Sequence, residues 1–328
     1  MRAVILKGPN DLEIVDDWPE PECGPDQVIV KIRTVGICGT DLSGISGKGF
    51  PRDYPGIIGH EGGGEIVKVG SEVTDRFVGQ RVVIENNFPC MECEFCLQGR
   101  SSLCPTKIGS VGGNTWPGLL ADYLAAPARF TWPVPDSVPD IALGCIEPLA
   151  VGYAAVKRAG VKPGQDAFII GAGSVGQLVA QSLKAIGAQG WVQDPHEGRV
   201  QTAVALGAKV ASDYQGEDFP FVFETSGVAA MWNEGLSRLR RGGHFTAIGL
   251  AHGGTVDLDP LDIVLRQLTI RGNMIYDHPT DFRATLDALA AGTLVAEAPV
   301  EARYTFEQSL EAIEKVRGIP GKSVIEFA

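Results

Sequence analysis

The sequence lacks the marks of a secreted, membrane-bound or nucleic-acid-binding protein. Its first residues, Met1 to Lys7, have no apolar core or cleavage site of a signal peptide, and no apolar run reaches the roughly 18 residues that a membrane helix needs. Basic residues are few: 28 lysines and arginines face 40 aspartates and glutamates, a net charge of −12. Nucleic acid and anionic membranes both attract basic patches. We therefore expect a soluble, cytoplasmic protein that binds neither.

The remaining composition is that of a globular protein, with 44% hydrophobic and 21% charged residues. A chain of 328 residues is long enough for two domains with separate cores. Seven cysteines are present. Because the cytosol keeps thiols reduced, a disulfide framework is not expected, and the cysteines need another explanation.

Four of these cysteines lie within 15 positions. They are separated by two, two and seven residues and are Cys90, Cys93, Cys96 and Cys104. A compact set of four thiolates is typical of a closed, structural zinc site. An iron–sulfur cluster and a redox pair are the alternatives, but the spacing is not that of a ferredoxin. The pattern favours structural zinc.

A second candidate site lies between Ile37 and Glu65. Cys38, His60 and Glu61 supply a thiolate, an imidazole and a carboxylate within 24 residues. These are ligand types of zinc, and a catalytic site takes three of them and keeps one position open. The surrounding sequence predicts a loop-rich antiparallel β region, in which both halves of this set fall in loops.

The middle of the chain carries a dinucleotide-binding pattern. A predicted buried strand, Asp166 to Ile170, is followed by a glycine-rich turn and a helix with a 3.6-residue apolar stripe. The residues of the turn expected to bind cofactor are Gly171, Gly173, Ser174, Val175 and Gly176. The pyrophosphate would sit at the positive N-terminus of the helix.

The choice between NAD and NADP depends on the end of the next strand. Asp194 lies there and would accept hydrogen bonds from the adenosine ribose, and its charge would repel a 2′-phosphate. This favours NAD. Arg199 lies nearby and could hold a 2′-phosphate, so NADP stays open as the less favoured cofactor.

Further strands and helices alternate through this part of the chain, which predicts an α/β fold with a parallel sheet. The connection between Val210 and Phe221 is too short for a full crossover helix, so we expect a loop there. The C-terminal part predicts amphipathic helices near 282–289 and 306–316, and Thr305 and Gln308 have the spacing of a capping box at the start of the second. Lys322 to Phe327 is expected to be a strand that rejoins the first domain.

Taken together, these segments resemble the zinc-dependent medium-chain alcohol dehydrogenase family over nearly the whole chain. The matching segments are Gly36–Asp41, Gly59–Glu61, the four cysteines from Cys90 to Cys104, Glu147–Leu149 and Gly171–Gly176. Glu147-Pro148-Leu149 resembles the polyol, sorbitol, threonine and butanediol dehydrogenase branch.

The resemblance implies a GroES-like β-barrel catalytic domain, formed by residues 1–149 and 283–328, and a Rossmann cofactor domain, residues 150–282. It implies one catalytic and one structural zinc ion per chain. It also implies a homodimer or homotetramer built by pairing the edges of cofactor-domain sheets.

Carried over residue by residue, the resemblance makes Cys38 and His60 ligands of the catalytic zinc. The third ligand is Glu61 or Glu147, and the resemblance does not decide between them. Thr40 matches the hydroxyl that takes the proton from the alcohol.

Three further positions match residues with a role in the family. Ser43 stands where many relatives have the histidine that completes the proton relay, which leaves the last proton acceptor open. Thr225 and Ile248 match positions that line the cofactor.

The function that this implies is reversible oxidation of a secondary alcohol by NAD to give a ketone, with a polyol, cyclitol or sugar-like substrate. The alternative is a dehydrogenase or reductase for small substrates such as butanediol, acetoin or threonine. A more remote alternative is a protein that binds zinc and NAD without catalysis. The sequence does not identify the substrate.

Overall fold

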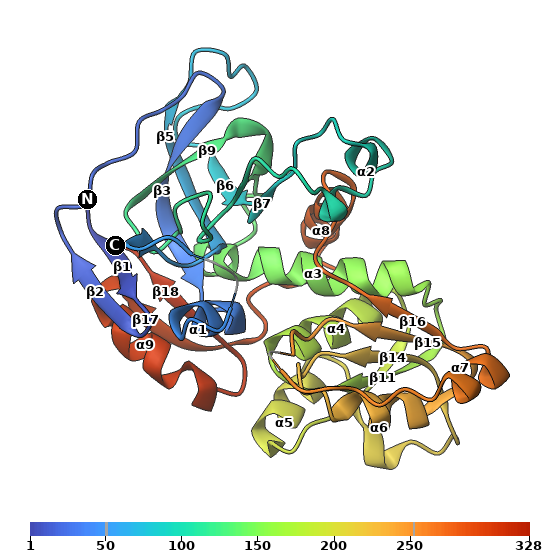
Figure 1. Cartoon of the computed structure of the whole chain (residues 1–328). Coiled ribbons are helices and arrows are strands. Elements are labelled where there is room, and N and C mark those ends of the chain that lie inside the picture. The colour runs from blue at the N-terminus through green and yellow to red at the C-terminus, as the bar shows by residue number, and fades with distance from the viewer. Residues whose placement is uncertain (50–51, 252) are drawn as a thin grey trace. The chain divides into compact units, whose positions relative to one another are not determined.

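The computed structural model describes every residue except 50–51 and 252. The chain folds into two compact units (Figure 1). Met1–Glu147 and Leu286–Ala328 form the first unit, and Pro148–Thr285 form the second. The second unit is therefore inserted into the first. The boundary at Pro148 lies inside helix α3 (Leu143–Ala159), which belongs to both units.

The first unit is built on a seven-stranded, mainly antiparallel sheet. The strands lie in the order β10 (Thr131–Pro133), β6 (Arg81–Ile84), β5 (Glu61–Val69), β3 (Gln27–Gly36), β18 (Lys322–Glu326) and β17 (Val300–Thr305), and β9 (Tyr123–Pro127) also pairs with β3. Strand β3 buries every second side chain, including Val28, Val30 and Ile32, because successive residues of a strand point to opposite faces. These side chains form the core of the unit.

Smaller elements complete the first unit. They are β1 (Ala3–Gly8), β2 (Asp11–Val15) and β4 (Gly56–Ile57) in one sheet, β7 (Asn87–Phe88) and β8 (Gly109–Ser110) in another, and the helices α1 (Gly39–Ile45), α2 (Glu94–Leu97) and α9 (Ser309–Lys315). Thr305 and Gln308 form the capping box expected from the sequence, ahead of α9.

One expectation about this unit holds for two of the three candidate zinc ligands. Cys38 and His60 lie in loops, with Cys38 as the N-cap of α1, but Glu61 is the first residue of β5. The glycines after Glu61 belong to the strand, and their lack of a side chain has a steric reason. A Cβ atom at Gly63 would lie 2.3 Å from the Val82 carbonyl oxygen, and one at Gly64 would lie 1.9 Å from that of Lys31.

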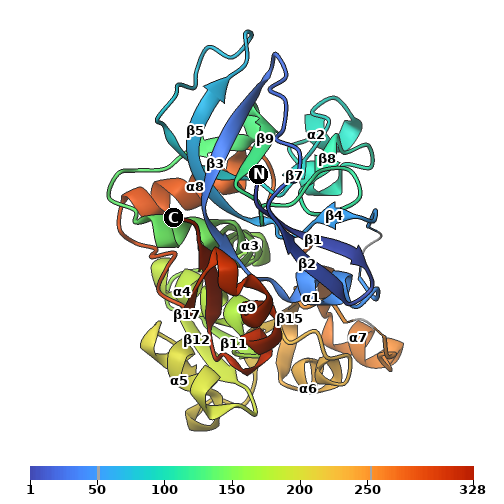
Figure 2. The same ribbon diagram turned by 90° about the vertical axis from the view of Figure 1, so that its left-hand side faces the viewer.

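Strand β18 connects the C-terminal segment to the first domain, as expected from the sequence. It runs antiparallel to β3, with Val324 opposite Gly36. The C-terminus of the chain, just after β18, therefore lies in the first unit (Figure 2). Since Lys322 lies two residues before Val324, this register brings Lys322 next to the chain that follows β3. That chain begins with Ile37 and Cys38.

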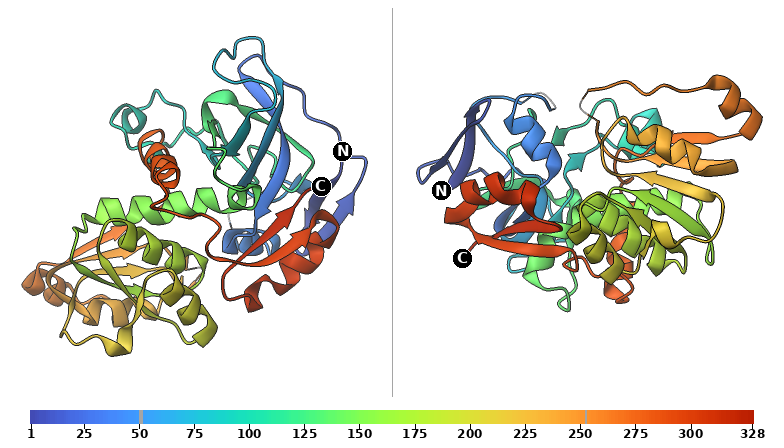
Figure 3. Two further views of the ribbon diagram at one scale, coloured as in Figure 1. Left: turned by 180° about the vertical axis from the view of Figure 1, so that it is seen from behind. Right: turned by 90° about the horizontal axis from the view of Figure 1, so that it is seen from below.

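The second unit contains a six-stranded parallel sheet (Figure 3). Its strands lie in the order β13 (Lys209–Val210), β12 (Gln189–Gln193), β11 (Asp166–Ile170), β14 (Phe219–Glu224), β15 (Leu239–Ala247) and β16 (Thr269–Gly272). Counted from β11, this is the order 3-2-1-4-5-6 of the Rossmann fold. The predicted fold class is confirmed.

Both faces of the parallel sheet carry an apolar core. On one face the core includes Ile169 and Phe223 and the helices α4 (Ser174–Ala185) and α5 (Glu197–Ala205). On the other face it includes Phe168 and Phe245, which pack against α6 (Met231–Ser237). The remaining helices of the chain are α7 (Pro260–Arg266) and α8 (Thr280–Ala290).

The connection from β13 to β14 contains one short 3₁₀ turn, Ala211–Asp213, and no α-helix among its residues. The expectation of a shortened crossover is confirmed. In the part of the chain that the structure describes, no helix is long and apolar enough to cross a membrane.

Candidate metal centres and cofactor site

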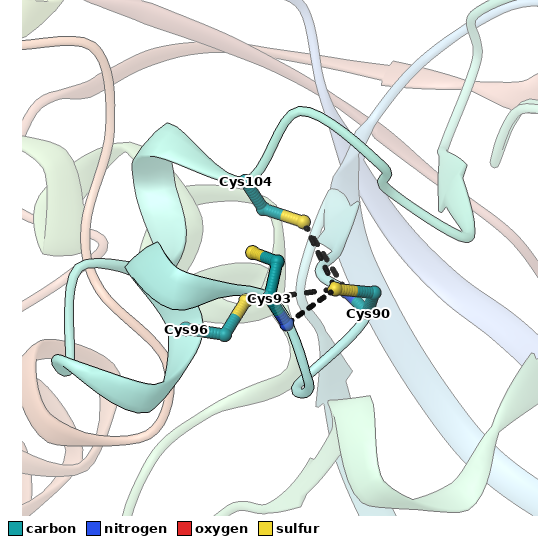
Figure 4. A group of neighbouring side chains, drawn as sticks. All are labelled: Cys90, Cys93, Cys96 and Cys104. Carbon is teal, nitrogen blue, oxygen red and sulfur yellow. Dashed lines mark hydrogen bonds between the residues drawn. The ribbon is translucent and has the colours of Figure 1, made fainter.

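The four cysteines predicted to bind structural zinc converge in the first unit (Figure 4). Their sulfur atoms all lie within 4.8 Å of one another, and the sulfur of Cys90 is 3.5 Å from that of Cys104 and 4.0 Å from that of Cys96. Four sulfurs placed tetrahedrally about 2.3 Å from zinc would be about 3.8 Å apart. The thiols are free rather than paired in disulfides. The arrangement fits one metal ion.

Local hydrogen bonds prepare this site for a cation. A hydrogen bond from the Thr106 hydroxyl and backbone amides, including that of Cys93, lower the pKa of Cys90 to about 6. Burial raises the pKa of Cys96 to about 12. Zinc binds the thiolate form of cysteine. Cys90 therefore loses its proton and becomes a ligand more readily than Cys96.

A second group of metal-binding side chains consists of Cys38, His60 and Glu61, whose ligand atoms also lie within 4.8 Å of one another. Adjacent strands bring them together. Gly36 at the end of β3 is opposite Glu61 at the start of β5. Cys38 follows β3 by two positions, and His60 directly precedes β5. The two residues therefore lie side by side.

The imidazole of His60 is held in one orientation by Asp41. Its Nδ1 atom lies 3.0 Å from Asp41 Oδ1, while its Nε2 atom lies 3.2 Å from the Thr40 hydroxyl. Asp41 also accepts a hydrogen bond from the Cys38 amide at 3.1 Å. Carboxylate–histidine pairs of this kind fix the tautomer that leaves the other nitrogen available to a metal.

Electrostatics in this pair favour the charged forms. Burial by itself would raise the pKa of Asp41, but His60 and Arg52 bring it below its usual range. Burial would lower the pKa of His60, and the Asp41 carboxylate reverses this and raises it well above normal. Sequence reasoning missed this role of Asp41, although its position three residues after Cys38 is that of a capping box.

The Thr40 side chain lies beside those of Cys38 and His60. Its hydroxyl oxygen is 3.2 Å from Cys38 Sγ and 3.2 Å from His60 Nε2. A group placed here is within reach of any substrate oxygen held by the same ligands. Ser43 lies one turn further along α1, and its hydroxyl donates to the Gly39 carbonyl at 3.3 Å.

The two glutamates proposed as third ligand are placed differently. Glu61 belongs to the group formed by Cys38 and His60. Glu147 is buried in α3 and, among the described residues, is not part of that group. Glu61 also makes an ion pair with Lys322, which is buried and comes from the far C-terminal strand. Nothing in the sequence near Cys38 or His60 indicates that lysine.

In the second unit, the glycine-rich turn forms a cradle for a phosphate. Gly171 has a φ of +93°, a conformation that L side chains rarely adopt, and a Cβ at Gly176 would lie 2.0 Å from the Gly171 carbonyl oxygen. A Cβ at Gly173, by contrast, would meet no atom within 4 Å. Gly173 is the N-cap residue of α4, and no side chain caps the helix by accepting a hydrogen bond from its first backbone amides. An open space over these amides fits an anionic phosphate.

Asp194 lies at the end of β12 beside this turn. Its carboxylate accepts hydrogen bonds from the amides of Ala172 and His196, both at 2.8 Å. Asp194 lines a cavity of about 240 Å³, together with residues that include Ser212 and Arg238. The shortened connection after β13 contributes Ser212 to the wall. This cavity is where an adenosine held by Asp194 would find space.

The other proposed cofactor residues lie in the same unit. Thr225 donates its hydroxyl to the carbonyls of Ile170 and Gly171 at 3.0 and 2.8 Å, so it contacts the glycine-rich turn directly. Ile248 is buried just after β15, and its amide donates to the Glu224 carbonyl at 2.8 Å. Arg199 lies in the first turn of α5.

A Rossmann unit with a phosphate cradle and a β unit with two zinc-type donor sets define a zinc-dependent dehydrogenase. Comparison with known families agrees: the model of the alcohol dehydrogenase GroES-like domain matches residues 24–136, and that of zinc-binding dehydrogenases matches residues 174–291. The chain belongs to the zinc-dependent medium-chain alcohol dehydrogenase family.

Individual proteins resemble the chain over nearly its full length. A sorbitol dehydrogenase of Bombyx mori is 32% identical over 335 residues, covering 95% of this chain and 94% of its own. The crystal structure of an oxidoreductase/dehydrogenase of unknown specificity from Escherichia coli matches with a TM-score of 0.91 and 31% identity, covering 100% and 99% of the two chains. A putative zinc-binding dehydrogenase from Sinorhizobium meliloti 1021, bound to NADP, matches with a TM-score of 0.88 and 27% identity, covering 99% and 98%.

These matches confirm the predicted family and the predicted reaction class. The protein is an NAD(P)-dependent oxidoreductase of the zinc-type alcohol dehydrogenases.

Proposed function

We propose that the protein oxidises a secondary hydroxyl group of a polyol or sugar-like substrate to a ketone, with NAD as hydride acceptor and zinc at the Cys38 site. The observation that carries this is the placement of the Thr40 hydroxyl 3.2 Å from both Cys38 Sγ and His60 Nε2. The similarity to a sorbitol dehydrogenase supports the substrate class.

Cys38, His60 and Glu61 are the residues that would hold the catalytic zinc, and the four cysteines from Cys90 to Cys104 would hold a structural one. When bound, the catalytic zinc supplies Lewis-acid chemistry that lowers the pKa of an alcohol. Asp41 keeps His60 Nε2 turned toward the ligand group. Glu147 remains an alternative ligand, but its position outside the group favours Glu61.

Thr40 is the group that would receive the proton from the substrate. Its hydroxyl can accept one hydrogen bond and donate another at the same time, so it can pass a proton on without a change of charge. Ser43 would follow as the next group, and solvent is the final acceptor. The Ser43 hydroxyl would have to turn away from the Gly39 carbonyl to do this.

The phosphate cradle at Gly173 and the carboxylate of Asp194 are the groups that would orient the cofactor, which supplies the hydride chemistry. The negative charge of Asp194 favours NAD. Asp194→Asn keeps an acceptor but removes the charge. We expect the preference of this variant for NAD over NADP, measured as the ratio of the two kcat/KM values, to fall by a factor of about ten or more. An unchanged ratio would contradict the assignment.

We also infer a homodimer formed through the exposed face of α7 and the neighbouring edge strand β16. The apolar side chains of α7 are mostly in solvent: Leu261 is 63%, Val264 70% and Leu265 61% exposed. An unpaired strand edge and an exposed apolar patch are both features that a second copy would cover. Replacing Val264 and Leu265 with glutamate should give a monomer in analytical ultracentrifugation.

The experiment that tests the proposed function is NADH formation by the zinc-loaded protein on a panel of polyols, cyclitols, butanediols, threonine and simple secondary alcohols, with NADP in parallel. Turnover on a polyhydroxylated substrate with NAD supports the proposal. Preference for butanediol or threonine would overturn the substrate class. Absence of turnover on the whole panel, with zinc and NAD both bound, would overturn the proposed activity.

A further inference from the structure

Lys322 is a buried cation at the catalytic metal site. It is the first residue of β18, its side chain is 2% exposed, and its ammonium forms an ion pair with Glu61 Oε2. The two residues are 261 positions apart in the sequence. A buried lysine is rare unless it is paired, because removing its charge from water is costly.

The partner of this ammonium is a carboxylate that also belongs to the candidate metal site. Lys322 and Glu61 are both buried, and the Lys322 ammonium forms its ion pair with Glu61. The charge that Lys322 balances is therefore that of Glu61.

The Glu61 and Lys322 side chains meet over Gly36. A Cβ atom at Gly36 would lie 2.8 Å from Glu61 Oε2 and 2.9 Å from Lys322 Cε, so both side chains pack directly over this glycine. The Lys322 amide is also anchored, since it donates to the Pro299 carbonyl at 2.7 Å. The Glu61 carboxylate is thus held between the ammonium on one side and the group formed with Cys38 and His60 on the other.

We propose that Lys322 is a positioning residue that competes with the catalytic metal for Glu61. By binding one carboxylate oxygen, the ammonium leaves at most the other for the metal and weakens Glu61 as a ligand. Glu61 then binds reversibly, and the coordination position that it occupies can be vacated for substrate. This inference rests on the proposed zinc site at Cys38, His60 and Glu61.

The inference predicts the direction of a change in metal affinity. Without the ammonium, Glu61 is free to bind the metal with its whole charge, and the metal should be held more tightly. A residue that merely stabilised the fold would do the opposite, because its loss would loosen the site. Outer contacts of metal ligands commonly alter affinity by about 10- to 100-fold, and we expect tightening of about tenfold.

The test uses cobalt(II) at the catalytic site of the full-length protein, with zinc kept in the four-cysteine site. Cobalt affinity is measured by competition with a chromophoric chelator, and its visible spectrum reports the ligands. Cys38→Ser identifies the bands of the catalytic site. Lys7→Met is a matched control, because Lys7 is an ion-paired lysine of the same unit, 2.9 Å from Glu13, but far more exposed.

We expect Lys322→Met to bind cobalt about tenfold more tightly, with a changed spectrum, and Lys322→Arg to stay within about threefold of the wild type. In the Glu61→Gln background, adding Lys322→Met should change the affinity much less, since no carboxylate remains to be released. Equal tightening in both backgrounds would indicate charge repulsion alone and would overturn the proposal. Weaker binding in Lys322→Met would also overturn it.

This design distinguishes a failure of the proposed zinc site from a failure of the proposed competition between Lys322 and the metal. If Lys322→Met fails to fold, because it leaves Glu61 unpaired, Lys322→Gln takes its place: it can still donate a hydrogen bond to Glu61 but carries no charge, and it should also bind cobalt more tightly than the wild type. If Cys38→Ser leaves the cobalt spectrum unchanged, the proposed zinc site itself is wrong. If only the Lys322 variants behave like the wild type, the zinc site stands and the competition is refuted.

Discussion

The two candidate metal sites of the first unit differ in how their side chains are assembled. The four-cysteine site comes from a single stretch of 15 residues, and its side chains are alike. The Cys38 site takes residues from just after β3 and from the start of β5, and Lys322 of β18 pairs with its Glu61. A site whose role is to hold a metal needs only its ligands. A site whose role is to react also needs groups that orient, protonate and balance charge around them.

The first way to test this difference is to remove one ligand from the reactive centre. Cys38→Ser should lower kcat by at least about 10³-fold, because zinc contributes several kcal/mol to stabilising the developing charge. The affinity for NAD, measured by fluorescence titration, should change little, and so should the melting temperature. A variant with wild-type activity would show that Cys38 is not a ligand.

The matching change at the four-cysteine site should act on stability instead. Cys104→Ser should lower the melting temperature by about 10 °C, because structural zinc contributes several kcal/mol of folding free energy and about 2–4 °C is lost per kcal/mol in proteins of this size. Activity per folded molecule at low temperature should be largely retained. A large fall in activity without loss of stability would show that the four-cysteine site also acts in catalysis, and would contradict the proposed difference between the two sites.

A smaller effect is expected when the ligands are left intact and the proton path is removed. Thr40→Val keeps the shape of the side chain but has no hydroxyl, and kcat should fall by about 10²-fold or more. Thr40→Ser should recover most of the rate. Metal content, measured by atomic emission, should stay at the wild-type value in both variants. Equal losses in the valine and serine variants would indicate a packing role.

The smallest effect is expected from the group that orients a ligand. Asp41→Asn can still contact the His60 ring but lacks the charge that now favours one orientation. We expect metal affinity at the catalytic site to fall by about tenfold, at the lower end of the usual range for such contacts. The four-cysteine site should keep its metal. Equal losses at both sites would mean that the substitution disturbs the whole unit.

A local feature could be predicted from the sequence where all the residues that form it lie in one short segment. The four cysteines, the turn from Gly171 to Gly176 and the capping box at Thr305 each depend on residues a few positions apart. The buried strand Asp166–Ile170 was found with its observed bounds, because apolar runs next to glycine turns are strong signals. The expectation of a loop around Glu61 failed, because Gly62 to Gly64 suit a crowded strand as well as a turn.

By itself, the sequence determined the family, the two donor sets and the cofactor turn of this protein. These depend on the types of a few residues and on the short spacings between them, and both are given by the sequence without knowledge of the fold. Only the tertiary structure showed that the carboxylate of Glu61 lies within 4.8 Å of the ligand atoms of Cys38 and His60, that Asp41 contacts the imidazole, and that Lys322 pairs with Glu61. Such contacts depend on strand register, and register follows from the packing of the whole sheet rather than from any one segment.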